Sequence, residues 1–433
     1  MKRFLPAVFL PALLVAQQPS DAGFRPISLQ DAVALAQKNA PAAVQAQGAI
    51  QNARGTVKTT YNQFFPTLSG SLGHSQGAGQ VLDNGGKLIP RVSRPQYSTS
   101  LAANYTLWDG GKRVYDLRAR NADLDALEVA ADATQFTLAL QVKQQYFAIL
   151  AARESEAAAK LALDLAQQQL DASVAKVRAG AAIISDSLRS AIAVGNAQLT
   201  LLNAQNSVRN TSLTLTRLVE SPVPVSASAS DTAAFAITPI DSAAIVAAAL
   251  DGPSVRQAKA NLVSADAAVR SAKSAWWPSL STSLRYGGNG YDMLYGLGGS
   301  PLAYSNTFSL NLSFPIWDGY ARSEAVHRAR TTVTTDSVQV ADAKLLAQQN
   351  IQLQISTLRT AEQRIRIQQL SVQAAQEDLR VQQQRYALGS STLLDLTTSV
   401  NSLNAARQAL IQARLDYRTS RAQIEAIIGR DLR

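Results

Sequence analysis

A helix-breaking stretch of eleven residues occurs twice in this chain, at residues 176–186 and 385–395. In each copy a long helical pattern reaches a glycine, is interrupted for a few residues, and resumes just before an aspartate. Gly180 and Gly389 lie 209 positions apart, and the two aspartates keep the same spacing. This even spacing indicates that the turn belongs to a duplicated unit.

Other landmarks repeat in the same order. An aromatic-Pro pair at residues 65–66 returns at 277–278, and a Trp-Asp-Gly tripeptide occurs once in each copy. The tripeptides are Trp108, Asp109 and Gly110, then Trp317, Asp318 and Gly319. We therefore divide the chain into a leader (1–22), a first repeat (23–220), a linker (221–239) and a second repeat (240–433).

The leader has the features of a cleaved signal peptide. A basic start precedes an apolar run at residues 4–16, and Ala16 or Ala22 offers a cleavage site. The run is too short to span a membrane, and no other apolar run reaches about 18 residues. We expect an exported chain that enters a membrane, if at all, as strands. The chain has no cysteine, which excludes disulfides, cysteine metal sites and a lipid anchor on cysteine.

Four segments alternate between apolar and polar residues with the period of a β-strand: residues 67–72, 97–107, 279–286 and 306–314. Each repeat holds one pair, separated by a Gly-rich loop. One face of each segment suits lipid and the other suits water, which is typical of membrane barrels. A sheet half buried on a globular core would show the same alternation. No further amphipathic element remains to cover these faces, which favours the barrel.

The remaining sequence is strongly helical, with long uninterrupted segments at residues 114–179 and up to 388, each followed by a further helix after its turn. A helix is also expected from residue 28 to about 63, kinked or split at Pro41. In the second long helix two heptad series run in parallel, one through Ile351, Leu358 and Ile365 and the other through Leu353 and Ile367. The series lie roughly 200° apart around the helix. A helix with two seams packs between two neighbours, as in a cylinder wall.

One chain supplies four strands, whereas a membrane barrel has no free edges. Two copies would give eight strands, and the interior of such a barrel is filled by side chains. Three copies give twelve strands, the smallest closure with room for an aqueous lumen, although sixteen are also permitted. We predict a mainly α-helical trimer with a twelve-stranded barrel and a helical tunnel.

The signal peptide, the two repeats, the aromatic-Pro starts, the Trp-Asp-Gly exits and the Gly-x5-Asp turns together resemble the TolC-type outer membrane factor family. The resemblance covers nearly the whole mature chain. It implies an outer membrane channel whose tunnel crosses the periplasm. It further implies partners: a periplasmic adaptor and an inner-membrane pump of the RND, ABC or MFS type, in an efflux or type I secretion system. No cofactor is implied.

In that family the helical turns lie at the periplasmic end, where the coils open and close. The resemblance places Asp395 at a pore constriction, with Tyr386 and Asp186 as gate residues. It assigns adaptor docking to the turns, at Arg178, Gly180, Gly389 and Ser391. It also places the two Trp-Asp-Gly tripeptides at the barrel-to-tunnel boundary. A known member carries an arginine at the position of Ser391 and a second acidic residue at that of Thr398. The departures imply a single acidic ring and a weaker lock.

Simpler roles compete with these assignments. Asp186 and Asp395 each precede a helix and could be N-caps; we favour the cap for Asp186 and the pore ring for Asp395. Tyr386 continues a heptad seam, so core packing is as reasonable as gating. The glycines end the long helices whatever the function, and the Trp-Asp-Gly exits anchor an interface more plausibly than they bind a ligand.

The sequence offers no set of residues for catalysis. His74 and His327 are isolated, and no nucleophile–base set, phosphate loop or metal cluster is present. The net charge is +10, but the basic residues are spread along helices and not clustered with aromatics, which argues against nucleic-acid binding. We predict a passive conduit. The alternative is a periplasmic coiled-coil adaptor or scaffold without a pore, and an enzyme is the weakest of the three interpretations.

Overall fold

A computed structural model describes residues 23–82, 85–92, 94–228, 237, 241–291 and 302–432. The predicted signal peptide, most of the second half of the linker and part of the second Gly-rich loop lie outside the described residues. The chain forms two compact units. The turn unit combines Met1–Ala40, Leu138–Pro239 and Gln354–Gln423, and it contains both helical turns. The sheet unit combines Pro41–Thr137, Ile240–Leu353 and Ile424–Arg433.

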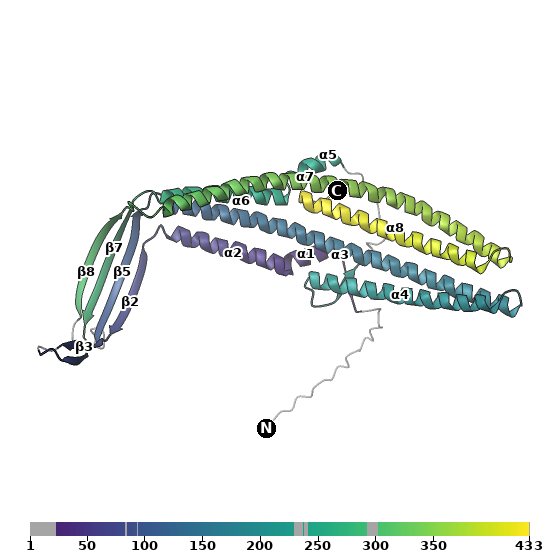
Figure 1. The fold of residues 1–433 in the computed structure, drawn as a ribbon, viewed down its shortest axis with the longest axis horizontal. Coiled ribbons are helices and arrows are strands. Elements are labelled where there is room, and N and C mark those ends of the chain that lie inside the picture. Colours follow the sequence, from purple (N-terminus) through teal and green to yellow (C-terminus); the bar gives the residue numbers. More distant parts are fainter. Residues whose placement is uncertain are drawn as a thin grey trace, which may run out of the picture. The chain divides into compact units, whose positions relative to one another are not determined.

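Long helices dominate both units (Figure 1). The helices are α1 Leu29–Asn39, α2 Pro41–Asn62, α3 Lys112–Arg178, α4 Ile184–Leu218, α5 Ser242–Ala249, α6 Pro253–Ser274, α7 Ala321–Ala387 and α8 Leu393–Ile428. Helices α3 and α7 are 67 residues each, and each contributes to both units. The predicted long helices are therefore confirmed. None of the described helices contains an apolar stretch of the length that crossing a membrane requires.

The predicted break at Pro41 is a complete split. Ser28 caps α1, its hydroxyl accepting from the Asp31 N–H at 3.1 Å. Ala40 is extended, with ψ 140°, and α2 begins at Pro41. A residue before proline is driven out of the helical region by the proline ring, so α1 ends there.

The sheet unit holds a four-stranded antiparallel sheet in the order β2-β5-β7-β8 (Figure 1). Its strands are β2 Thr67–Ser75, β5 Gln96–Trp108, β7 Ser279–Gly290 and β8 Ala303–Ser313. All four strands were predicted. Because β5 pairs with β7, the sheet joins the two repeats, and β2 and β8 form its two edges.

A short hairpin lies where the sequence analysis predicts only a Gly-rich loop. Strand β3 Ala78–Leu82 pairs with β4 Leu88–Val92. The loop prediction was wrong here because glycines and a proline interrupt the alternation. Main-chain hydrogen bonds hold two antiparallel strands together without requiring a side-chain pattern.

The sheet has one apolar face and one polar face, as predicted. On the apolar face the register places Leu284 opposite Phe308, and both side chains are exposed. Leu68, at 70%, is likewise exposed on the edge strand β2. On the polar face the hydroxyls of Ser71 and Ser100 lie 2.7 Å apart. A continuous exposed apolar surface of this kind marks a site that lipid or protein covers.

The turn unit contains a small parallel pairing that the sequence analysis missed. Strand β1 Arg25–Ile27 pairs with β6 Val225–Ala227, which falls in the predicted linker. The fully buried Tyr146 of α3 fixes this pair, since its hydroxyl donates to the Ile27 carbonyl and accepts from the Ser228 N–H, both at 3.0 Å. Strands of three residues are too short to show a periodic pattern, so no sequence signal identified them.

The two heptad seams of α7 have different environments. Leu358 and Ile365 of the first series are 0% exposed, so the chain itself fills this seam. Leu353 and Ile367 of the second series are both 58% exposed, and Leu388 is also open. One seam is thus satisfied within the chain and the other presents an apolar row outward.

A substitution at Gly110, in the first Trp-Asp-Gly tripeptide, tests the packing of the sheet unit. Its φ is +69°, and an added Cβ would collide with the Trp277 side chain and lie 2.9 Å from the Ser274 carbonyl oxygen. We expect Gly110→Ala to destabilise the protein by roughly 2–4 kcal/mol, from left-handed strain and overpacking. Gly48→Ala, inside α2 where a Cβ meets nothing within 4 Å, should be neutral or stabilising. Thermal unfolding followed by circular dichroism in detergent would reveal the difference, and equal midpoints would contradict this packing.

Candidate functional site at the helical turns

Both helical turns close with the same glycine cap. Gly180 has φ +73°, and the N–H of the next residue donates to the Lys176 carbonyl at 2.8 Å. Gly389 has φ +77°, and the following N–H donates to the Arg385 carbonyl at 2.9 Å. This six-to-one bond satisfies carbonyls that the ends of α3 and α7 would otherwise leave unpaired. The duplicated spacing seen in the sequence therefore reflects a duplicated backbone geometry.

Asp395 is the third residue of helix α8 and forms part of the cap at its start. Its Oδ2 accepts from the Thr392 hydroxyl at 2.7 Å and from the Thr392 N–H at 3.0 Å. In return the Asp395 N–H donates to the Thr392 hydroxyl at 3.2 Å, which completes a reciprocal capping box. The Thr392 hydroxyl and then its N–H lower the pKa of Asp395 below its usual value. The carboxylate is exposed and charged at neutral pH.

Asp186 does not act as the cap that the sequence analysis favoured. The residue at the start of α4 is Ile183, which offers no side-chain cap, and the Asp186 N–H donates to the Ile183 carbonyl at 3.0 Å. Neither aspartate is therefore the N-cap: each is the third residue of its helix, α4 or α8, and only Asp395 takes part in a capping box, in which Thr392 is the N-cap. The reason lies three residues earlier, because Thr392 supplies a hydroxyl at the position where the first copy has an isoleucine.

Tyr386 is held by a lysine from the other repeat. The Lys176 ammonium lies 3.8 Å from the centroid of the Tyr386 ring and also donates to the Tyr386 backbone carbonyl. The ring is buried in a cluster with Leu379, Leu393 and Leu396. Tyr386 therefore packs in the core and also contacts the other repeat. Its contact with Lys176 connects the end of α3 to the end of α7.

The phenol of Tyr386 stays protonated. Burial first, and then the negative charge of Asp186, raise the pKa of Tyr386 above its usual value. Among the described residues its hydroxyl has no hydrogen-bond partner. Asp186 therefore influences Tyr386 through its charge, while Lys176 makes the direct contact.

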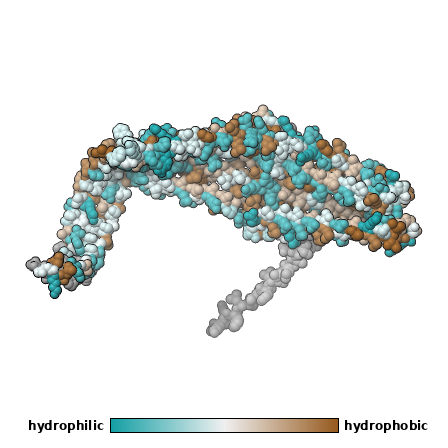
Figure 2. All heavy atoms as spheres, in the orientation of Figure 1, coloured by the Kyte–Doolittle hydropathy of each residue, from teal (hydrophilic) through white to brown (hydrophobic). Residues whose placement is uncertain are grey.

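The other predicted residues of the turns lie on the surface or near it. Ser391 donates to the Gln382 side-chain oxygen at 2.9 Å, and Arg178 is exposed. Exposed apolar side chains gather at the free end of the α3–α4 hairpin (Figure 2), where Ile183 and Ile184 are 65% and 69% exposed. The end of the first hairpin is thus an exposed apolar surface, and the last turn of α3 beside it carries Lys176 and Arg178.

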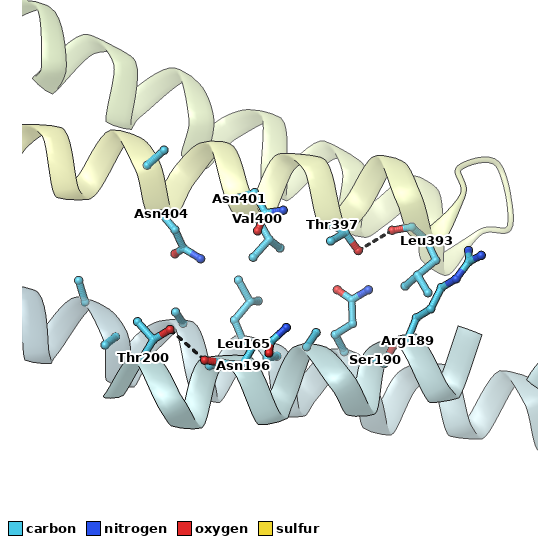
Figure 3. A pocket seen from close by; sticks show the side chains of 18 of the residues that line it. Leu165, Arg189, Ser190, Asn196, Thr200, Leu393, Thr397, Val400, Asn401 and Asn404 are labelled. Atoms are coloured by element: carbon cyan, nitrogen blue, oxygen red, sulfur yellow. Dashed lines mark hydrogen bonds between the residues drawn. The ribbon is translucent and has the colours of Figure 1, made fainter. Parts of the chain in front are cut away.

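A cleft of about 780 Å³ lies behind the turns, between α3 and α4 on one side and α8 on the other (Figure 3). Asn401 and Asn404 of α8 face Asn196 and Leu165 across it. Among its lining residues only Arg189 carries a charge. Apart from Arg189, the cleft is therefore lined by amides, hydroxyls and small apolar groups. Within the described residues no cluster of His, Asp or Glu could hold a metal ion.

The Trp-Asp-Gly exits contain matching ion pairs in the sheet unit. Asp109 accepts from the Arg113 backbone N–H at 3.1 Å and its Nε at 2.9 Å, and Asp318 does the same for Arg322 at 3.1 and 2.6 Å. Each aspartate thereby caps the long helix that follows its strand. These contacts join each strand to the helix that follows it.

Comparison with known proteins defines the class. A family model described as outer membrane efflux protein matches residues 32–220 and 244–430. These segments make up most of the chain, and the protein belongs to the outer membrane efflux protein family. The resemblance to TolC-type channels is confirmed, and the chain is an outer membrane channel of the efflux and secretion class.

Individual relatives are similar over nearly the full length. Protein CyaE of Bordetella pertussis is 26% identical over 407 residues, which cover 93% of this chain and 84% of CyaE. The open-state MtrE outer membrane channel of Neisseria gonorrhoeae matches with a TM-score of 0.75 at 21% identity, over 99% of this chain and 98% of MtrE. The CmeC outer membrane channel of Campylobacter jejuni matches with a TM-score of 0.76 at 18% identity, over 99% and 94%. These structures establish the fold.

The Lys176–Tyr386 contact yields a direct test. We expect Lys176→Met to weaken the joint between α3 and α7 by about 1–2 kcal/mol, through loss of a cation–π contact and a hydrogen bond. The channel should then open roughly five to thirty times more readily, measured as open probability in planar bilayers. Lys176→Arg should keep most of the closed population, because it keeps a cation over the ring. Lys160→Met removes an exposed lysine of the same helix and serves as the control. Equal effects of Lys176→Met and Lys160→Met would show that the Lys176–Tyr386 contact does not hold the channel closed.

Proposed function

We propose that three copies of this chain assemble into a passive exit duct for efflux or type I secretion. The observation that carries this proposal is the four-stranded sheet, with an exposed apolar face and two edge strands. Unpaired strand edges promote aggregation in water, and exposed apolar faces are unfavourable there. A closed barrel in a bilayer pairs the edges and covers the apolar face with lipid. Three copies would supply twelve strands and leave a water-filled lumen lined by the polar face.

The open seam of α7 supports the same assembly. Leu353 and Ile367 present an apolar row outward, and Leu188 and Ile192 do so on α4. Coiled-coil packing buries such rows against a neighbouring helix. We infer that these rows meet neighbouring copies and build the wall of a helical tunnel in the periplasm. The two sequence repeats, 23–220 and 240–433, would then be successive segments of this wall.

Exposed aromatic side chains fit the boundary between barrel and tunnel. Trp108 and Trp317 are both largely exposed, beside the aspartates that cap α3 and α7. Tryptophan prefers the interface between lipid and water, where its ring is buried and its N–H stays hydrated. We assign the Trp-Asp-Gly exits to the periplasmic surface of the outer membrane. Export through a cleaved signal peptide at residues 1–22 completes this localisation.

The helical turns are the proposed gate and docking surface. Three copies of the exposed Asp395 carboxylate would form an acidic ring at the tunnel mouth, and acidic rings select cations. Tyr386, fastened by Lys176, and Asp186 would hold the closed arrangement. The exposed apolar end around Ile184, with Arg178, Gly180, Gly389 and Ser391 nearby, suits a periplasmic adaptor that links the duct to an inner-membrane pump. The chain itself would carry out no chemistry and use no cofactor.

Assembly can be tested on the open seam. We expect Ile367→Asp to prevent trimer formation, because it places a charge in an apolar interface without a partner. Gln369→Asp adds the same charge at an exposed position of α7 outside both seams and should leave the trimer intact. Sedimentation in detergent would distinguish the two, and an intact Ile367→Asp trimer would show that this row faces solvent.

Two variants separate the proposed pore charge of Asp395 from its role in the cap of α8. Asp395→Asn keeps a side-chain oxygen for the Thr392 hydrogen bonds and removes only the charge, whereas Thr392→Val removes the cap and keeps the charge. In planar bilayers under a KCl gradient, we expect Asp395→Asn to lower the cation preference roughly two- to fivefold, since ring charges in a wet pore are worth about 0.5–1 kcal/mol. Thr392→Val should retain the preference.

The same measurement has a predicted pH dependence. The folded-state pKa of Asp395 lies below its usual value, so the wild-type preference should persist as pH falls to about 4, the ordinary range for aspartate. It should be lost only as pH falls through the lowered pKa. An unchanged preference in Asp395→Asn would remove the residue from the pore ring, and wild-type protein without any conductance would contradict the channel.

A further inference from the structure

Arg285 is the only Lys, Arg, Asp or Glu in the four strands β2, β5, β7 and β8. It is the seventh of the twelve residues of β7, a central strand of the sheet. The other polar side chains of these strands are those of serine, threonine, asparagine and tyrosine, with one glutamine (Gln96) and one histidine (His74). A single charge in the middle of an otherwise neutral sheet requires a physical explanation, because a membrane strand loses stability when its charge faces lipid.

The side chain of Arg285 lies on the polar face. Its guanidinium donates to the Ser100 hydroxyl of β5 at 3.3 Å, and Ser100 in turn lies 2.7 Å from the Ser71 hydroxyl of β2. Two residues earlier on β7, the Ser283 hydroxyl lies 2.6 Å from that of Ser309 on β8. Leu284 and Tyr286, the chain neighbours of Arg285, point to the opposite, apolar face.

A cavity of about 630 Å³ lies where the polar face meets the beginning of α3. Asn104, Ser283 and Asn311 line it from the strands, and Lys112 and Asp116 line it from the helix. Arg285 is two residues beyond Ser283 on the same face of β7. In a closed barrel with an apolar exterior, Arg285 would therefore point into the lumen.

Arg285 differs from the cations at the beginning of the long helices. Arg113 and Arg322 are paired with Asp109 and Asp318 at 2.9 and 2.6 Å. Arg285 instead donates to a serine hydroxyl, and the four strands contain no carboxylate. Its positive charge is therefore left for a mobile anion to neutralise.

We propose that three copies of Arg285 form a ring of positive charge inside the barrel, which binds the carboxylate or phosphate groups of passing solutes. The inference rests on the proposed trimeric channel and adds a site to it. Planar guanidinium groups bind such anions through paired hydrogen bonds, and rings of arginine favour anions in pores. The neutral hydroxyls around each Arg285 would solvate a solute without competing for the charge.

The dimensions of a twelve-stranded barrel make this ring effective at moderate salt. Strands about 4.8 Å apart and tilted by about 40° give a backbone diameter of roughly 24 Å. An extended arginine reaches about halfway to the axis, so the remaining gap is comparable to the Debye length of about 8 Å at physiological ionic strength. The ring should therefore act on ions across the lumen at low salt and be screened at about 1 M.

Block by inorganic tripolyphosphate in planar bilayers tests the ring. Added to either side in turn, in about 0.1 M KCl, the polyanion should reduce the current through wild-type channels, and salt of about 1 M should abolish the effect. We expect Arg285→Gln to weaken the block about fivefold or more, as the loss of one screened charge contact per chain implies. Arg285→Lys should retain most of the block.

Two further variants separate charge from structure. Arg94→Gln removes an equal charge outside the four strands, and tripolyphosphate should block this variant as strongly as the wild type. Thr307 pairs directly with Arg285 across β7 and β8, so the double variant Arg285→Gln with Thr307→Arg moves the charge to a neighbouring site on the same face. The double variant should recover the block, and it also guards against a misfolded Arg285→Gln.

Equal block in the wild type and Arg285→Gln would overturn the ring, as would an Arg285→Lys channel that behaves like Arg285→Gln. A double variant that conducts without any block would do the same. If wild-type channels conduct but tripolyphosphate does not block them, only this inference is contradicted. If the wild-type chain forms no channel, the proposed function is contradicted as well.

Discussion

Unsatisfied apolar surface is the constraint on which this structure depends. The chain fills one heptad seam of α7 with its own side chains and leaves the other, through Leu353 and Ile367, exposed. It pairs four strands and leaves their apolar face and the edges of β2 and β8 open. Burial of apolar area is the dominant favourable contribution to folding, and main-chain groups left unpaired away from water are costly. A chain that leaves both incomplete is built to obtain them from a membrane and from further copies.

The two helical turns show how duplicated elements acquire different roles. Both end a long helix with the same glycine cap, at Gly180 and Gly389. Only the second turn has a threonine that forms a capping box with the acidic residue, so Asp395 is oriented while Asp186 is not. The contact between Lys176 and Tyr386 then ties the two turns together. Small differences in sequence thus give the two repeated turns different contacts, which is why we propose different roles for them in a gate.

Periodic features could be predicted from the sequence and contacts that depend on tertiary structure could not. The long helices, the four main strands and both seams were predicted because their patterns recur over many residues. The β3–β4 hairpin and the β1–β6 pair were missed because short strands leave no period. Asp186 was taken for a cap because a helix start alone does not reveal which side chain reaches the backbone. Lys176 and Arg285 stood in the sequence as ordinary basic residues, and only their positions against the Tyr386 ring and on the polar face made them informative.

Native mass spectrometry of the detergent-purified mature protein tests the central claim most directly. The 433-residue chain has a mass of 46.1 kDa, and the account predicts a particle of three mature chains that persists when detergent is stripped gently. The exposed seam and the open sheet edges then have partners of the same sequence. A protein that is monomeric under these conditions, at concentrations where it remains folded, would contradict the assembly on which the duct, its gate and its ring of arginines all depend.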